Sequence, residues 1–308
     1  MKDRGESLER IKGLFNITVT PFTADGALDH AALRANIERV IEIGYDGLLI
    51  GGTYGEFATM SADERMDLFK TAMDTAGDRV PVLLCTAHSD TRVVYDLTVA
   101  AGEMGGLPMV TAPYVSEVTE GQIESYFREV APASKTGIMV YNAPGIGITL
   151  SPGLIERLST VEGCVALKQG DLNPTVVDRI AATVVGKIRV LAASDLVFLG
   201  PVAAGFDGTS STNSCALPEI IHATYHAMKS GDAVRAGELH RMWYRIRALA
   251  REHGQPQTTK ALMNLRGWQG GHVRLPLRDL EGDILAALKE ELNALSSQPD
   301  SGVSHLAA

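Results

Sequence analysis

The sequence predicts an α/β protein: a (β/α)8 barrel followed by a helical extension. Short apolar runs recur through residues 14–211, with helical segments between them. These runs are continuous rather than alternating, as expected for parallel strands buried on both faces. From about residue 218 onward the pattern becomes wholly helical. Eight strands alternating with helices are typical of the TIM barrel, whose functional residues lie at the carboxyl ends of its strands.

Each candidate strand is short and rich in aliphatic or β-branched residues, and turn-forming residues bound it. The predicted strands are residues 14–20, 47–50, 81–86, 107–112, 137–142, 165–168, 189–193 and 208–211.

The helices between the strands begin at residues that cap well. An N-cap side chain accepts a hydrogen bond from the first turn, and a glutamate or glutamine three residues later completes a capping box. Gly44 is expected to end the first of these helices. The predicted caps are Asp29, Ser61 with Glu64, Thr119 with Gln122, Ser151, Asn173 and Asp195.

Three segments organise the chain. Residues 1–217 form the predicted barrel, and residues 218–296 form a helical region packed on it. Residues 297–308 are small and polar, and we expect a mobile tail there. Within the helical region the predicted helices are residues 219–229, 232–252, 258–265 and 278–295.

Composition excludes several function classes. The 308 residues carry a net charge of −9 and contain no basic run, so neither nucleic acid nor an anionic membrane is an expected partner. No stretch approaches the roughly 20 apolar residues of a membrane span, and residues 1–12 lack a signal-peptide core. The three cysteines are far apart, without C-x-x-C spacing. We expect a cytoplasmic protein.

Metal and nucleotide motifs are also missing from the sequence. His222 and His226 have the i,i+4 spacing of metal ligands, but Ala223 stands where H-E-x-x-H has glutamate, and no third ligand is in sight. We therefore predict no metal site. Neither a phosphate-binding glycine loop nor a G-x-S-x-G elbow occurs.

Lys168 is the main catalytic candidate. It follows Leu167 in an apolar strand, where desolvation of an ammonium is costly and lowers its pKa. A neutral amine is what covalent catalysis through a Schiff base requires. The alternative is a lysine that extends from the strand end to solvent.

Two further segments reach the same end of the predicted barrel. After the second strand, Gly52 lets the chain turn so that Thr53 and nearby N–H groups can meet an anion. Tyr141 ends the fifth strand, beside the strand of Lys168, so the two side chains could meet. A simple turn and a packing tyrosine are the alternatives. Glu56, in the same turn, is expected to satisfy backbone donors rather than to act in catalysis.

Together these motifs resemble the dihydrodipicolinate synthase and N-acetylneuraminate lyase family of class I aldolases. The likeness runs from about Gly13 to Leu280. It is carried by residues 19–22, the G-T-x-G-E turn at 52–56, Tyr141-Asn142 with Pro144, Lys168, and residues 205–210.

The resemblance implies a lyase acting on pyruvate or another 2-keto acid. Lys168 would form the Schiff base, Tyr141 would shuttle the proton, and the carboxylate would lie against Thr53 and Tyr54. Gly52 and Gly208 would complete the substrate-binding set. The resemblance implies neither a metal nor an organic cofactor, and it implies a homo-oligomer, a tetramer built as a dimer of dimers.

Three positions depart from the lysine-biosynthetic synthases of this family. Ile146 stands where those enzymes hold a substrate carboxylate with arginine, and Val115 stands where they have a relay tyrosine. Tyr54 replaces a small hydroxyl residue, which resembles, more weakly, members acting on aromatic pyruvate adducts. These departures argue against the lysine-pathway reaction, and residues 113–117 resemble more closely the family's 2-keto-3-deoxy sugar-acid dehydratases and aldolases. A hypothesis from another class, motivated by the missing tyrosine, is a regulator that binds a keto acid without turning it over.

Overall fold

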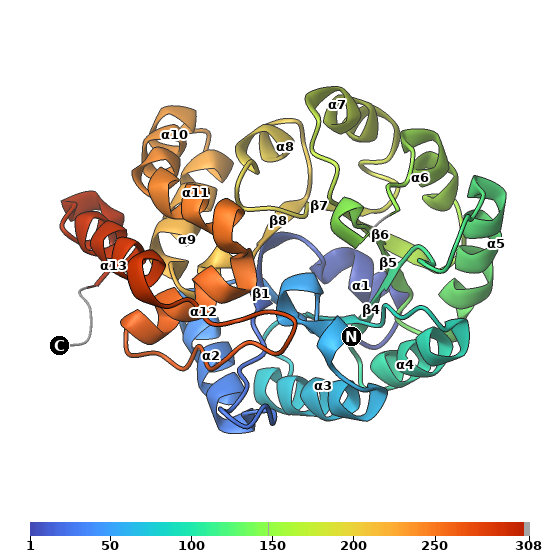
Figure 1. Cartoon of the computed structure of the whole chain (residues 1–308). Helices are drawn as coiled ribbons and strands as arrows, with labels where there is room; N and C mark the ends of the chain where they lie inside the picture. Colours follow the sequence, from blue (N-terminus) through green and yellow to red (C-terminus); the bar gives the residue numbers. More distant parts are fainter. Residues whose placement is uncertain (147, 305–308) are drawn as a thin grey trace.

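The computed structural model, which describes residues 1–146 and 148–304, contains a closed parallel barrel. Within these residues β1 to β8 follow one another around the barrel in chain order, and β8 pairs with β1 (Figure 1). The predicted fold class is therefore confirmed.

Every predicted strand run overlaps an observed strand, with ends that differ by one or two residues at most. Apart from the first residues of β1 and β7, all strand residues are buried, as parallel strands inside a ring of helices must be. The strands are β1 Gly13–Thr18, β2 Gly47–Ile50, β3 Val82–Cys85, β4 Leu107–Thr111, β5 Ile138–Asn142, β6 Cys164–Gln169, β7 Arg189–Ala192 and β8 Gly208–Ser211.

The helices that follow the strands surround the barrel (Figure 1). They begin where the sequence predicts at Asp29, Ser61, Thr119, Ser151 and Asn173, and each of these side chains accepts a hydrogen bond from the first turn. These helices are α2 His30–Ile43, α3 Ala62–Ala76, α4 Thr91–Glu103, α5 Glu120–Val130, α6 Pro152–Leu158, α7 Pro174–Thr183, α8 Leu199–Ala203 and α9 Pro218–Lys229.

Asp195 is not the helix cap that the sequence predicts. Helix α8 begins at Leu199, and its N-cap Phe198 provides no side-chain hydrogen bond. The Asp195 carboxylate is instead buried, where it accepts hydrogen bonds from the Ser211 hydroxyl and from the backbone N–H of Asn213 at 2.9 Å. The prediction was wrong because the loop after β7 directs this carboxylate toward the donors that follow β8.

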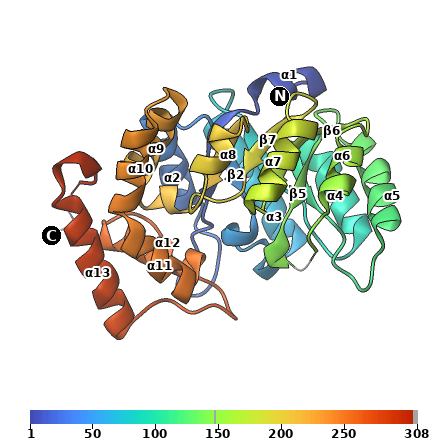
Figure 2. The same cartoon turned by 90° about the horizontal axis from the view of Figure 1, so that it is seen from above.

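A short helix at the amino end was not predicted. Helix α1, Arg4–Arg10, is capped by Asp3, and Ser7 donates a hydrogen bond to the carbonyl of Thr136, just before β5, at 2.9 Å. This contact places α1 at the amino ends of the strands. Figure 2 shows α1 at one end of the barrel and α11 and α12 toward the other.

The chain after α9 folds into helices, as predicted. The predicted helix 232–252 is interrupted at Trp243, whose φ of −104° and ψ of 22° end α10, and whose side chain is buried. Helix α9 contacts both α2 and α10, so the domain boundary between residues 217 and 218 stays a prediction. The helices are α10 Ala233–Met242, α11 Tyr244–His253, α12 Gln255–Leu265 and α13 Gly282–Ser296.

The predicted tail begins with ordered contacts. After α13 a 3-10 turn, η6 Pro299–Ser301, leads to Val303, which is buried, and Arg266 donates a hydrogen bond to the Ser304 hydroxyl at 2.9 Å. Residues 305–308 lie outside the described residues, and mobility of the tail stays a prediction.

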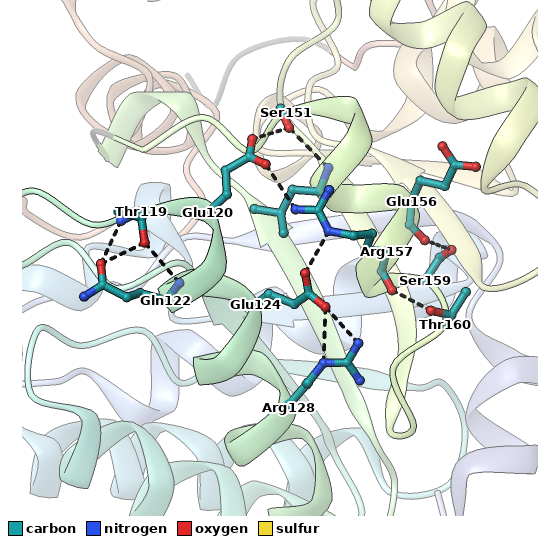
Figure 3. Close-up of polar contacts among 11 residues, drawn as sticks. Thr119, Glu120, Gln122, Glu124, Arg128, Ser151, Glu156, Arg157, Ser159 and Thr160 are labelled. Atoms are coloured by element: carbon teal, nitrogen blue, oxygen red, sulfur yellow. Dashed lines mark hydrogen bonds and ion pairs between the residues drawn. The ribbon is translucent and has the colours of Figure 1, made fainter.

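An exposed network of charges joins α5 to α6 (Figure 3). Arg157 on α6 pairs with Glu124 at 2.7 Å and with Glu120 at 3.1 Å, and Glu124 also binds Arg128. The Arg157 side chain is 46% exposed. Because solvent screens such pairs, they contribute little to stability.

Candidate active site

Neighbouring strands bring Tyr141 and Lys168 together. The two residues are register partners on β5 and β6, so their side chains point to the same face of the barrel wall. The Lys168 Nζ lies 4.1 Å from the centre of the Tyr141 ring. Lys168 is 2% exposed, which excludes the alternative of a lysine that reaches solvent.

The surroundings of Lys168 favour its neutral form. Burial lowers the pKa of Lys168 from its ordinary 10.5 to about 7, and a small opposing influence comes from Cys85. No carboxylate lies within ion-pair distance of this amine in residues 1–146 and 148–304. The neutral amine is therefore far more accessible at neutral pH than that of a solvated lysine.

Thr53 is the third member of the group. The 3-10 turn η1, Thr53–Gly55, follows β2 and carries the Thr53 hydroxyl to 3.2 Å from the Tyr141 hydroxyl. Burial raises the pKa of Tyr141 to about 12, and the hydrogen bond from Thr53 acts in the opposite direction. The phenol is therefore protonated at neutral pH and can donate a proton.

Gly52 and Tyr54 flank Thr53. A Cβ on Gly52 would lie 2.7 Å from Leu49 Cδ2, so glycine allows the turn to pack against β2. Tyr54 is partly buried, and burial raises its pKa, with smaller contributions from Tyr141 and Asp195. The structure thus gathers Gly52, Thr53 and Tyr54 in one turn beside Tyr141.

Gly208 lies on β8, two strands along the barrel from Lys168, and its role in substrate binding stays a prediction. It begins β8 and pairs with Gly13 at the start of β1. A Cβ on Gly208 would lie 1.9 Å from the carbonyl oxygen of Gly13, so a larger residue would force the two strands apart. This close strand packing accounts for the glycine.

Sequence reasoning missed the partner of Glu56. The Glu56 carboxylate is buried and forms an ion pair with Lys260 of α12, and it also accepts a hydrogen bond from the Arg274 N–H at 3.0 Å. The structural role expected for Glu56 is supported, but the donors come from the C-terminal region rather than from the turn itself. The only signal in the sequence was Lys260 itself, which stands in the middle of a helix among residues that are largely apolar or small.

Two of the departing positions lie in the segments that follow β4 and β5. Ile146 belongs to η4 Pro144–Ile146, directly after β5, and its side chain packs against the core. Val115, in the loop after β4, is 62% exposed. Neither side chain can hold an anion.

The remaining candidates carry no site. His222 and His226 have ring centres 4.1 Å apart on α9. Throughout residues 1–146 and 148–304, however, no three histidine, cysteine, aspartate or glutamate residues are grouped as a metal site requires. Over the same residues, no helix has the length and apolar character that crossing a membrane requires.

Comparison with known proteins identifies the family. A model of the Dihydrodipicolinate synthetase family matches residues 10–295, nearly the whole chain. This chain belongs to that family. As a family member it is an enzyme of the lyase class, and this removes support from the hypothesis of a non-catalytic regulator.

Several family members are similar over most of their length. A 4-hydroxy-tetrahydrodipicolinate synthase of Methanothrix thermoacetophila is 31% identical, covering 92% of this chain and 97% of the relative. The corresponding synthase 1 of Streptomyces coelicolor is 33% identical, covering 88% and 89%. A prophage protein of the family from E. coli K12, solved in complex with pyruvate, is 28% identical, with a TM-score of 0.85 over 92% of this chain and 98% of its own.

Proposed function

We propose that this lyase acts on pyruvate or another 2-keto acid through a Schiff base on Lys168. The observation that carries the proposal is the buried amine of Lys168, whose pKa is lowered to about 7, beside the phenol of Tyr141. A neutral amine is a nucleophile toward a ketone, and a nearby phenol can supply and accept the protons that the reaction moves.

The reaction begins with attack of the Lys168 nitrogen on the keto carbon. The carbonyl oxygen takes up a proton, giving a carbinolamine, and loss of water gives an iminium. In aldol cleavage the hydroxyl at C4 loses its proton and the C3–C4 bond breaks. Its electron pair moves toward the iminium nitrogen, so an aldehyde leaves and an enamine remains. Protonation at C3 and hydrolysis release the keto acid, and the reverse sequence is condensation.

Tyr141 and Thr53 have separate roles in this scheme. Tyr141 carries protons between the substrate oxygen and the leaving group, and its hydrogen bond to Thr53 orients the hydroxyl. The carboxylate is held by the Thr53 hydroxyl and by the backbone N–H groups of Thr53 and Tyr54. Among the described residues no acceptor is found for these two N–H groups. Free donors at the start of a turn suit an anion.

Ile146 supports a second candidate for the other reactant. An apolar side chain beside the Lys168 group cannot pair with the carboxylate of a second substrate. A 2-keto-3-deoxy sugar acid, cleaved to pyruvate and a hydroxylated aldehyde or dehydrated, needs no such pairing. The relatives are named synthases, so condensation of pyruvate with an aldehyde is the alternative reaction that should be assayed beside cleavage.

Trapping with borohydride tests the Schiff base. Reduction in the presence of pyruvate, or of a 2-keto-3-deoxy sugar acid, should add the reduced substrate's mass to the peptide containing Lys168. Lys168→Ala should show neither the adduct nor turnover. An unchanged mass across a panel of 2-keto acids would contradict the proposal.

We further propose a cytoplasmic homo-oligomer, a tetramer built as a dimer of dimers. The support is the family likeness, together with the net charge of −9. Light scattering on the purified protein should give four times the 32.9 kDa chain mass. A mass of 32.9 kDa at micromolar concentration would contradict the oligomer.

A further inference from the structure

We propose that Lys260 is a positioning residue that, through Glu56, fixes the turn carrying Thr53 and so sets the enzyme's affinity for the keto-acid carboxylate. The inference rests on the function proposed above and adds a residue from the C-terminal helical region to the site.

The backbone at Glu56 needs external support. Glu56 has φ 60° and ψ 35°, and no other non-glycine residue in the described part of the chain has a positive φ. It joins η1, which carries Thr53, to η2 Phe57–Thr59. Non-glycine residues keep this left-handed conformation only where their surroundings hold them, and such residues cluster at functional sites.

The support comes from the C-terminal region. One oxygen of the Glu56 carboxylate pairs with Lys260, and the other accepts the N–H of Arg274 at 3.0 Å. Lys260 also donates to the carbonyl of His272 at 2.7 Å and lies 4.7 Å from the centre of the Phe22 ring. The Glu56 and Lys260 side chains are 1% and 2% exposed, so water does not replace these contacts.

The turn is fixed on its other side by β1. Thr20 donates a hydrogen bond to the carbonyl of Gly55 at 2.7 Å, and a Cβ on Gly55 would lie 3.3 Å from the Thr18 carbonyl oxygen. The segment from Thr53 to Glu56 is therefore held between the end of β1 and helix α12. If the Lys260 contact is lost, only the backbone N–H of Arg274 still holds Glu56 from the C-terminal side, and the donors of Thr53 are less firmly fixed in direction.

A second ion pair, at the C-terminal end of α12 and with a buried arginine, provides the matched control. Arg266, at the end of the same helix, pairs with Glu219 at 2.7 Å and donates to the carbonyl of Ala216 at 2.6 Å. It attaches α12 to the start of α9 and makes no contact with the Thr53 turn. If Lys260 acted on stability alone, loss of Arg266 would have the same effect on pyruvate binding as loss of Lys260. If Lys260 positions the turn, only its own loss should weaken binding.

The test compares Lys260→Met, the double variant Glu56→Gln/Lys260→Met, and Arg266→Met in the full-length protein. The double variant leaves no unpaired buried charge, so it remains testable where Lys260→Met does not fold. The readouts are the pyruvate concentration that gives half-maximal borohydride adduct, the maximal adduct, and pyruvate affinity by calorimetry.

We expect half-saturation to rise about 10- to 100-fold in both variants that lack Lys260, because small displacements of a binding group have effects of this size. The maximal adduct should remain, and Arg266→Met should stay within about twofold of the wild type. Unchanged half-saturation in the Lys260 variants, or an equal rise in Arg266→Met, would overturn the inference. If the wild type forms no adduct, the proposed function fails, and the same comparison by calorimetry still decides the role of Lys260.

Discussion

Lys168 and Lys260 are both buried, yet their surroundings differ in one respect. Lys260 contacts the Glu56 carboxylate, which opposes the lowering of the Lys260 pKa by burial. Lys168 faces the ring of Tyr141, and no carboxylate among the described residues pairs with it. Burial therefore acts almost alone on the pKa of Lys168. The two lysines are distinguished by whether a carboxylate lies beside the amine rather than by how deeply the amine is buried. With a carboxylate the amine stays a structural cation, and without one it can be a nucleophile.

The phenol beside Lys168 gives the largest expected effect. Tyr141→Phe keeps the ring that packs on Lys168 and removes the hydroxyl that carries protons. Turnover should fall about 10²- to 10⁴-fold, while the borohydride adduct still forms on Lys168. Steady-state kinetics and mass spectrometry on the same preparation check this. A variant with wild-type turnover would show that the phenol only packs against the amine.

Removing each lysine should affect stability in different ways. Lys260→Met leaves the Glu56 carboxylate buried without its partner, so the free energy of unfolding should fall by about 3–5 kcal/mol. Lys168→Met leaves no unpaired charge behind and should cost no stability. Denaturant unfolding of both variants measures the difference. An equal loss of unfolding free energy in the two variants would contradict the proposed difference between the two lysines.

The pH dependence of stability should distinguish Lys168. Its pKa is about 7 in the folded chain and 10.5 ordinarily, so between these pH values the unfolded chain binds a proton that the folded chain lacks. Stability from this group therefore rises with pH across that window, by up to about 1.4 kcal/mol per unit, and is constant below it. Unfolding free energies at several pH values should rise more steeply with pH in the wild type than in Lys168→Met. Parallel pH profiles for the two proteins would contradict the lowered pKa.

The exposed charges between α5 and α6 should give the smallest effect. Arg157→Ala removes two ion pairs, but the Arg157 side chain is 46% exposed (Figure 3). Because solvent screens these pairs, the expected loss of unfolding free energy is well below that of Lys260→Met. Thermal unfolding of the two variants side by side checks the ranking, and a loss from Arg157→Ala as large as that from Lys260→Met would reverse it.

The group of Lys168, Tyr141 and Thr53 could be predicted because strand order decides it. Adjacent strands in a parallel barrel place the residues near their carboxyl ends side by side, and the sequence marks each strand as an apolar run. The capping residues of α2, α3, α5, α6 and α7 could be read for a similar reason, since a cap depends only on residues within one turn.

Other features depend on contacts that no local pattern encodes. Lys260 meets Glu56 across 204 residues, and a lysine within a helix is ordinarily solvated. Asp195 has the sequence of a cap but meets donors from the next strand's loop. Trp243 interrupts a helix that periodicity alone makes continuous. In each of these cases tertiary packing overrides local preference.

The long separation between Glu56 and Lys260 also has a consequence for synthesis. A growing chain can pair β1 with β2 early, but residue 260 leaves the ribosome only after every strand has been made. Until then the anion-holding turn is fastened on one side only. If the proposed roles of Lys168 and of the Thr53 turn hold, a nascent polypeptide binds the keto acid weakly, and full affinity is reached only when translation is complete.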